Sequence, residues 1–218
     1  MGRLFDDAAS DKMRSGSAAV SSQPFTLCGW FNFDTLALAL QCPFVVGTTG
    51  SSDHQWRTIV NNTPRLVFRA RSTSAGSATG TGIPVINVWQ HYAGVEINAA
   101  SRDVLLNAAG KGSNTSSITP SGMDETLLGA TSGVAYGSFI SGLLADWALW
   151  NVALSDTEIA ALARGTHPLK IRTVNLTNFW QLYGLGSPEP DYSRGQKSMT
   201  LTGTAVGAHV YTSLPYET

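Results

Sequence analysis

The strongest constraint on the fold is a regular alternation of side chains between Phe25 and Phe33. Phe25, Leu27, Gly29, Phe31 and Phe33 fall on one face. The opposite face carries Thr26, Cys28, Trp30 and Asn32. A period of two residues is that of a β-strand, whose successive side chains point to opposite sides. We therefore predict one long, half-buried strand in this segment.

Further short segments are rich in apolar and β-branched residues and are predicted as strands: residues 44–47, 54–60, 65–71, 88–97, 104–106, 125–128, 139–150, 176–182, 199–201 and 209–212. Between them lie segments of turn or loop composition, notably residues 48–52, 72–82 and 108–114. About ten short strands joined by such turns favour an all-β fold in which two antiparallel sheets form a sandwich.

One segment follows a helical pattern instead. Ser155 and Glu158 have the spacing of a capping box, in which each side chain bonds to the backbone N–H of the other residue. Ile159 and Leu162 then recur at helical spacing, and a glycine and a proline end the run. We predict a single short helix at about residues 156–164.

No long linker or internal repeat interrupts the sequence, so residues 1–218 are predicted to form one domain. Residues 8–22 are small and polar and allow two interpretations. They form either a loop-rich connection after a first strand at residues 4–6 or an arm that orders on docking to a partner, and the first interpretation is favoured.

Composition excludes several classes of function. Charged residues make up 13% of the chain and the net charge is -1, which argues against binding nucleic acid through phosphate neutralisation. The longest apolar stretch, residues 139–150, is too short to span a bilayer. The first thirty residues contain no pattern of a secretion signal. Without such a signal, reduced thiols are favoured over a disulfide for Cys28 and Cys42.

Residues 139–155, followed by Glu158 and Ile159, carry a Gly-x-x-x-Asp element, aromatic residues, an Ala-Leu-Ser cap and a short helix. This segment resembles the signature of laminin-G-like domains of the concanavalin A-like jelly-roll superfamily. Other segments match in the same order: Pro24 to Phe31, Trp89 to Val95, Leu105 to Gly110, and Phe179 to Leu182 with Asp191 and Ser193. The resemblance implies a jelly roll of two antiparallel sheets with loops at the ends for ligands or metal. The sequence departs from the family pattern at Trp147, where a Glu is frequent, and at Tyr92, where a second His is usual.

Catalysis is not expected. Retaining glycosidases of this superfamily carry Glu-x-Asp-x-x-Glu on one strand, whereas Glu189 and Asp191 here flank a proline and Arg194 takes the place of the second Glu. The histidines are scattered without the spacing of a catalytic or zinc site. His91, on an apolar strand, is interpreted as a hydrogen-bonded structural residue. We therefore predict a protein that is not an enzyme and that needs no cofactor.

The resemblance implies one candidate metal, a structural calcium ion, because laminin-G-like and lectin domains often hold one in their loops. The candidate ligands are Asp6, Asp7, Asp146 and Asp191. Asp146 is the foremost candidate, since it is an acid within an apolar strand. The alternative, which is favoured, is that Asp146 accepts backbone hydrogen bonds or pairs with Arg3 or another arginine.

Sugar binding would use an aromatic side chain as a platform and amides to bond hydroxyls. Trp56 and Tyr136 are the preferred platforms because they adjoin loops, and Asn61 and Asn62 are candidate polar ligands. Arg65, Arg69 and Arg71 alternate along one predicted strand and share a face. They form either a patch for an acidic partner or polyanionic glycan or, as is favoured, a solvated sheet face.

These observations lead to a hypothesis about function. We predict a non-catalytic surface protein of a bacteriophage particle, either a capsid decoration or a tail-associated protein. Its partners would be capsid or tail proteins, cell-surface glycans and further copies of itself in a homo-oligomer. A laminin-G-like domain without a secretion signal suits a virion that is released by lysis. The alternative is an extracellular lectin, or a carbohydrate-binding module of a larger secreted protein.

Overall fold

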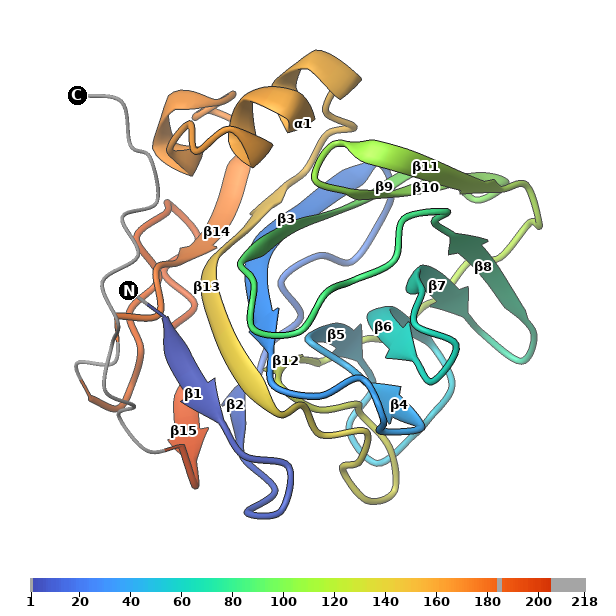
Figure 1. Cartoon of the computed structure of the whole chain (residues 1–218). Coiled ribbons are helices and arrows are strands. Elements are labelled where there is room, and N and C mark those ends of the chain that lie inside the picture. The colour runs from blue at the N-terminus through green and yellow to red at the C-terminus, as the bar shows by residue number, and fades with distance from the viewer. Residues whose placement is uncertain (1, 184–185, 205–218) are drawn as a thin grey trace.

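Within residues 2–183 and 186–204, which the computed structural model describes, two antiparallel β-sheets face each other across a common core (Figure 1). Sheet A has seven strands, in spatial order β1 (Arg3–Phe5), β13 (Gly142–Trp150), β3 (Phe25–Phe33), β9 (Gln90–Asn98), β10 (Ser101–Leu106) and β11 (Ala109–Asn114), with β14 (Leu176–Trp180) also paired to β13. Sheet B has eight strands, in spatial order β15 (Thr200–Thr202), β2 (Lys12–Ser15), β12 (Glu125–Leu128), β5 (Phe44–Gly47), β6 (Gln55–Asn61), β7 (Leu66–Arg71) and β8 (Ala75–Thr79), with β4 (Leu40–Gln41) also paired to β6.

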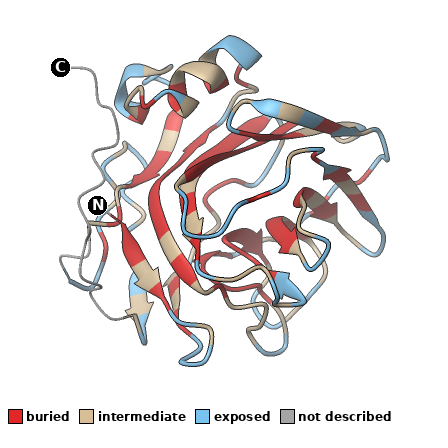
Figure 2. Cartoon of the chain, viewed as in Figure 1, coloured by how far each residue is buried: buried red, intermediate tan, exposed pale blue. Residues whose placement is uncertain are grey.

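This architecture confirms the predicted all-β jelly-roll sandwich. Buried residues line the strands of both sheets, whereas exposed residues concentrate in the connections and on the outer side of the helix (Figure 2). No helix in the described ranges is long and apolar enough to cross a bilayer. The strand predicted at residues 209–212 lies outside the described residues, and the single domain over residues 1–218 remains a prediction.

β3 confirms the strand expected from the alternation, and it lies in the middle of sheet A between β13 and β9. Its large inward side chains, such as Phe25 and Phe31, are 1% exposed and belong to the core. The prediction of a half-buried strand was wrong for its first residues, because Thr26 and Cys28 on the opposite face are also buried. A second layer of structure covers that face.

The second layer is the helix. α1 (Asp156–Ala163) confirms the predicted helix, and its capping box is formed as expected: Ser155 Oγ accepts from Glu158 N, and Glu158 Oε2 accepts from Ser155 N. Ile159 and Leu162 pack with Trp150 on the outer face of sheet A. A short 3-10 helix, η1 (Pro168–Lys170), follows. The helix therefore lies on the side of sheet A that faces away from sheet B (Figure 1).

Two segments predicted as loops are edge strands, β8 within residues 72–82 and β11 within residues 108–114. Glycine and small residues signal turns in a sequence, but here they mark a close approach of two backbones. A Cβ atom at Gly112 would lie only 1.9 Å from the carbonyl oxygen of Thr79. Only glycine fits at this point, where the edges of the two sheets meet.

Residues 8–22 also contain a strand that the sequence did not predict. β2 pairs with β12 on one side and β15 on the other. Met13, its one large apolar side chain, is fully buried, while Arg14 points to the opposite face of the sheet. A strand of four residues with a single apolar member is too short to produce a recognisable alternation.

The two cysteines are free thiols, in agreement with the favoured prediction. Cys28 belongs to the cluster beneath α1 on the outer face of sheet A. Cys42 belongs to a small cluster on the outer face of sheet B. Burial raises the pKa of both thiols, so neither is poised as a nucleophile at neutral pH.

A β-bulge in β13 directs Trp147, one of the tryptophans of the core between the sheets, toward sheet B. Between Ala145 and Ala148 the register of β13 against β3 shifts by one residue. The extra residue, Asp146, has a φ of 50°, a left-handed conformation that Asp tolerates better than most residues. The bulge changes the alternation of the strand, so Trp147 points into the core.

Trp147 connects the two sheets. Its indole stacks on Phe44 of sheet B, with 5.7 Å between ring centroids, and on Tyr92 of sheet A, at 5.9 Å. Its Nε1 donates a hydrogen bond of 3.2 Å to the carbonyl oxygen of Trp30. Gly29 supplies the space, because a Cβ atom there would lie 2.3 Å from Trp147 Cδ2.

We predict that Gly29→Ala destabilises the protein by about 2–3 kcal/mol, because the indole cannot yield without losing its contacts with both sheets. Gly16→Ala is the control, since a Cβ atom at Gly16 meets nothing closer than 4.0 Å, and it should be nearly neutral. Urea unfolding followed by tryptophan fluorescence measures both changes. Equal unfolding midpoints for the two variants would contradict this packing.

Candidate functional site

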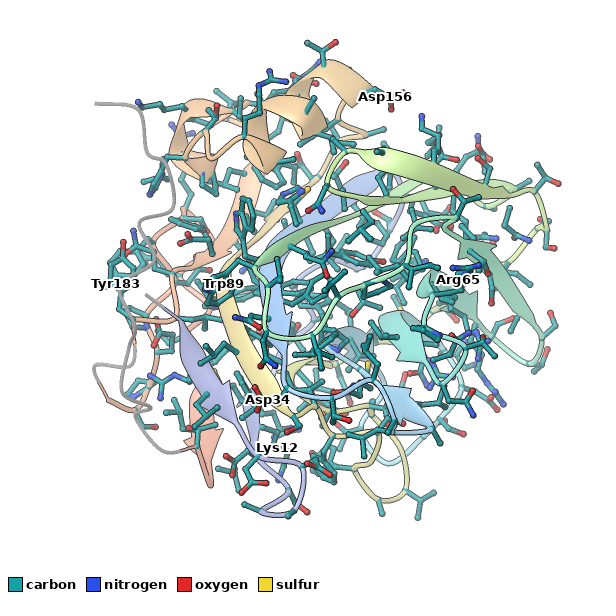
Figure 3. The ribbon with its side chains drawn as sticks, viewed as in Figure 1. Lys12, Asp34, Arg65, Trp89, Asp156 and Tyr183 are labelled. Atoms are coloured by element: carbon teal, nitrogen blue, oxygen red, sulfur yellow. The ribbon has the colours of Figure 1, made fainter. Side chains whose placement is uncertain are left out.

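Polar and charged side chains gather on the outer face of sheet B, the face turned away from sheet A. The alternation of β6 produces this arrangement. Trp56 and Val60 point into the core, so Gln55 and Arg57 point outward. The same rule places Arg69 and Arg71 on the outer face of β7, since Phe68 and Ala70 belong to the core. Figure 3 shows Arg65 beside β7 and Lys12 beside β2, which lie at different places along this sheet.

The structure corrects the expected position of Trp56. Its side chain is 2% exposed and packs edge-on against Phe25, with 5.0 Å between ring centroids. It is part of the core between the sheets and offers no platform to a ligand. Its position beside a loop in the sequence was misleading, because the face to which a strand residue points depends on the register of the strand.

Tyr136 is only partly buried and belongs to a network centred on Glu125 of β12. Arg14 Nε donates to Glu125 Oε2 at 2.7 Å, and the hydroxyl of Tyr136 donates to the same oxygen at 3.3 Å. The hydroxyl of Ser132 donates to Glu125 Oε1. Lys12 Nζ lies 5.0 Å from the centroid of the Tyr136 ring. We call Glu125, Arg14, Ser132 and Tyr136 the Glu125 network.

Local packing fixes this network. The Tyr136 ring rests on a small apolar cluster on the outer face, made by Cys42, Val45 and Leu127. Gly47 lets the neighbouring loop approach, because a Cβ atom there would lie 2.8 Å from Ser132 Cβ. Burial, and secondarily the charge of Glu125, raises the pKa of the Tyr136 phenol. Tyr136 therefore stays a neutral hydrogen-bond donor over the physiological pH range.

A group of three arginines lies on the same face, two strands away from β12. Arg57 of β6 is the direct cross-strand partner of Arg69 in β7, and Arg71 follows two residues later on the same side. Arg71 Nε bonds to Asp53 Oδ1 at 2.8 Å, and Arg69 Nε bonds to Ser77 Oγ at 2.8 Å. We call Arg57, Arg69 and Arg71 the basic cluster.

The sequence identified two members of this cluster and missed the third. Arg69 and Arg71 were expected to share a face with Arg65, which lies just before β7. Arg57 stands on another strand, so only the pairing of β6 with β7 brings it to Arg69. Its position in the alternation, one residue after Trp56, is the signal that would have placed it on the outer face.

Asn61 and Asn62 are not brought to Tyr136. Asn61 ends β6, and its Oδ1 accepts hydrogen bonds from Thr63 Oγ1 and Arg65 N, both at 3.1 Å. This amide therefore shapes the connection between β6 and β7. Asn62 is exposed in the same connection. Neither contributes to the Glu125 network, and a role of either residue in binding stays a prediction.

Asp146 is the bulge residue of β13 rather than one member of an acidic group. Its backbone N–H donates to the carbonyl oxygen of Gln181 at 3.3 Å. Arg3, suggested as its partner, instead forms a buried ion pair with Glu189 at 2.9 Å. Within the described part of the chain, no three His, Cys, Asp or Glu side chains are placed to hold a metal ion together. The candidate calcium site at Asp146, which the sequence disfavoured against a hydrogen-bonded or ion-paired acid, thus has no supporting ligand set among the described residues.

Glu189 and Asp191, the only Glu-x-Asp pair of the sequence, serve the fold. Glu189 Oε1 accepts from Leu182 N, and its other oxygen pairs with Arg3. Asp191 accepts from the backbone N–H groups of Phe179, Ser193 and Lys197 and from the amide of Asn178. These bonds occupy both carboxylates, so neither is free to act as a general acid or nucleophile.

The comparisons with known proteins agree with this description. The sequence profile of the concanavalin A-like lectin/glucanases superfamily matches residues 7–160. The chain belongs to this superfamily. No curated protein matches the sequence.

Several solved structures share the fold at low sequence identity. A putative carbohydrate-binding protein from Bacteroides ovatus has a TM-score of 0.71 and 15% identity over 95% of this chain, which spans 59% of that protein. CBM40 of a Ruminococcus gnavus sialidase, bound to α2,3-sialyllactose, has a TM-score of 0.56 and 15% identity, with 66% of this chain and 84% of that one covered. Tailspike protein 2 of the Escherichia coli O157:H7 bacteriophage CAB120 has a TM-score of 0.59 and 13% identity, with 83% and 26% covered.

His91, on β9 of this concanavalin A-like sandwich, is buried as its structural interpretation requires, but among the described residues its ring Nδ1 has no hydrogen-bond partner. It is 2% exposed, its backbone N–H donates to Asn107 Oδ1 at 2.7 Å, and its ring lies edge-on to Trp30 at 5.3 Å. Burial lowers the pKa of its imidazole from 6.5 to about 3. The folded protein therefore keeps this ring neutral at pH values where the unfolded chain takes up a proton.

We predict that His91 makes the protein less stable as the pH falls below about 6.5. Its contribution is fully present above the unfolded pKa and is lost progressively toward the folded pKa of about 3. The loss between pH 7 and pH 5 should be about 2 kcal/mol. Urea unfolding at several pH values measures it. His91→Gln should remove this part of the pH dependence and His54→Gln should retain it, so parallel curves for wild type and His91→Gln would contradict the prediction.

Proposed function

We propose that this chain is a non-catalytic glycan-binding domain that binds sugars on the outer face of sheet B. The observation that carries the proposal is the Glu125 network, which fixes the aromatic ring of Tyr136 next to charged hydrogen-bonding groups at the surface. Sugar recognition needs an apolar ring surface and a few polar groups held in fixed positions. The outer face of sheet A is less suitable, because α1 covers part of it.

We further propose that the domain acts on the surface of a bacteriophage particle, as a tail-associated or capsid decoration protein. The similarity to a phage tailspike, over 83% of this chain, supports this setting at the level of the fold. A carbohydrate-binding module of a larger extracellular protein is the second candidate. The Bacteroides ovatus protein and CBM40 favour it, and this chain spans only 59% of the former.

Assembly with further copies is part of the proposal, together with contacts to capsid or tail proteins. The connection between β8 and β9 exposes four large apolar side chains in six residues: Ile83, Val85, Ile86 and Val88. Exposed apolar side chains that cluster in this way are typical of protein interaction surfaces, whereas single ones are common everywhere. This connection would therefore be the place where copies meet in a homo-oligomer.

The glycan-binding proposal predicts that Tyr136→Ala weakens binding to the best ligand on a glycan array by about tenfold or more, because it removes the aromatic platform. Tyr136→Phe should retain most of the affinity, since the ring remains. Tyr192→Ala is the control, because Tyr192 is 45% exposed and lies near Phe179 of sheet A. Isothermal titration with the array ligand gives the affinities. Equal affinities of wild type and Tyr136→Ala would refute this site.

The assembly proposal predicts that the wild-type chain sediments as a symmetric oligomer in analytical ultracentrifugation. Ile86→Glu should shift it toward the monomer, because a charge at a contact would have to be desolvated. Val134→Glu is the matched control, since Val134 is 93% exposed in a different connection, and it should leave the oligomer intact. A wild-type chain that remains monomeric at all concentrations would overturn the homo-oligomer.

A further inference from the structure

We propose that the basic cluster of Arg57, Arg69 and Arg71 binds the carboxylate of an acidic sugar. This inference rests on the proposed function and names the class of glycan that the outer face of sheet B selects. The cluster and the Glu125 network lie on the same face, separated by β5. Two strand spacings, about 10 Å, lie between β12 and β6, so a single oligosaccharide would contact both.

The pairing of β6 with β7 forces the three guanidinium groups together. Arg57 and Arg69 are directly opposite each other, and the outward side chains of such cross-strand partners are neighbours. Arg71 lies one step further along the same face of β7, opposite Gln55. Like charges in directly opposed positions destabilise a sheet. The opposed arginines therefore cost stability in the free protein. An anionic ligand that binds between them would neutralise their charge and remove this cost.

The surrounding acidic groups do not neutralise the cluster. Asp53 forms an ion pair with Arg71 at 2.8 Å, with both side chains partly exposed. In the described part of the chain, no ion pair within 4.0 Å is found for Arg57 or Arg69. Burial, and then the neighbouring arginines, lowers the pKa of Arg69, and burial and Arg71 act in the same direction on Arg57. The cluster thus keeps an excess of two positive charges.

Two polar atoms of β6 at the basic cluster have no hydrogen-bond partner in the described part of the chain. Arg57 Nε is buried and has no hydrogen-bond partner among the described residues, and neither has Oε1 of the fully buried Gln55. A buried donor without a partner costs free energy. The planar guanidinium group matches a carboxylate with two parallel hydrogen bonds. A ligand carboxylate bonded to the outward ends of the guanidinium groups would offset the repulsion between them.

The rest of the molecule argues for a single anionic group rather than an extended polyanion. The net charge of the chain is -1, and acids stand among the basic residues of this face, with Glu125 beside Arg14 and Asp53 beside Arg71. A nucleic acid or a highly sulfated chain would require many cations along its path. A mostly neutral sugar chain with a carboxylate fits a compact cluster beside an aromatic ring.

The experiment compares acidic sugars with their neutral counterparts by isothermal titration at low salt. The probes are trigalacturonate against galactotriose and sialyllactose against lactose, so that the two arms separate a uronic acid from a sialic acid as the source of the carboxylate. At least one acidic probe should bind about tenfold more tightly than its neutral partner. Its affinity should fall as sodium chloride is raised.

The variant Arg57→Gln with Arg69→Gln should lose the preference for the acidic probe. Arg65→Gln is the matched control, because it removes one charge just before the same strand, outside the cluster, and should retain the preference. In urea unfolding without ligand, the double variant should be at least as stable as wild type, because like-charge repulsion is relieved. A purely structural role of the arginines would instead lower its unfolding midpoint.

The outcomes separate the two proposals. Equal affinities for acidic and neutral probes, unchanged in the double variant, would overturn the carboxylate inference and leave glycan binding intact. The absence of binding to every glycan on an array would overturn both. If the double variant folds poorly, the single variant Arg69→Gln and the salt dependence of wild type replace it. Wild-type affinity for the acidic probe that does not change with salt would contradict a role for the cluster.

Discussion

The packing of Trp147 between the two sheets is the contact on which the sandwich depends. Its indole touches both sheets at once, and it fits only because β3 has a glycine beneath it and β13 has a bulge before it. The indole, the glycine and the bulge come from two strands that are far apart in the sequence, and the packing requires all three. The relative position of the sheets is therefore set by a few interlocking residues, with the surrounding aliphatic side chains filling the remaining volume.

Side chains alternate along each strand, so the residues that point into the core determine which residues lie on the outer face of the same strand. In sheet A the outer face is apolar over the middle strands and is covered by α1. In sheet B the outer face carries a small apolar cluster under Tyr136, the cross-strand pair Ile59 and Val67, and a group of arginines, glutamine and acids. The inward direction of Trp56 and the outward direction of Arg57 are two consequences of one register. The candidate site is thus built by the same alternation that builds the core.

Much of the fold could be predicted from the sequence, because alternation and capping are local signals. The strand at residues 25–33 and the helix after Ser155 follow directly from side-chain spacing. β8 and β11 could not be predicted, since the glycine that lets their backbones meet also resembles a turn signal. For Asp146 the sequence favoured a hydrogen-bonded or ion-paired acid over a metal ligand, and the bulge could not be predicted because it appears only in the pairing of β13 with β3.

The candidate site was less predictable than the fold. Tyr136 was identified by its position in a connection, but its partners Glu125 and Arg14 come from two other strands. Trp56 was placed on the wrong face, and Arg57 was missed, because both judgements require the pairing of strands. Contacts between strands far apart in the sequence are the information that single-segment patterns lack.

The meeting of β8 and β11 has a consequence for the protein at high concentration. These two strands form one edge of each sheet, and their backbones face each other across Gly112. Thr81 N, just after β8, donates to Gly110 O of β11 at 2.9 Å. An exposed edge is a template on which a foreign strand can add. Here the edge of each sheet is shielded by the other, so crowded copies are kept from joining by strand addition along this side. Contacts between copies along this side are then left to side chains, which are more selective than a backbone.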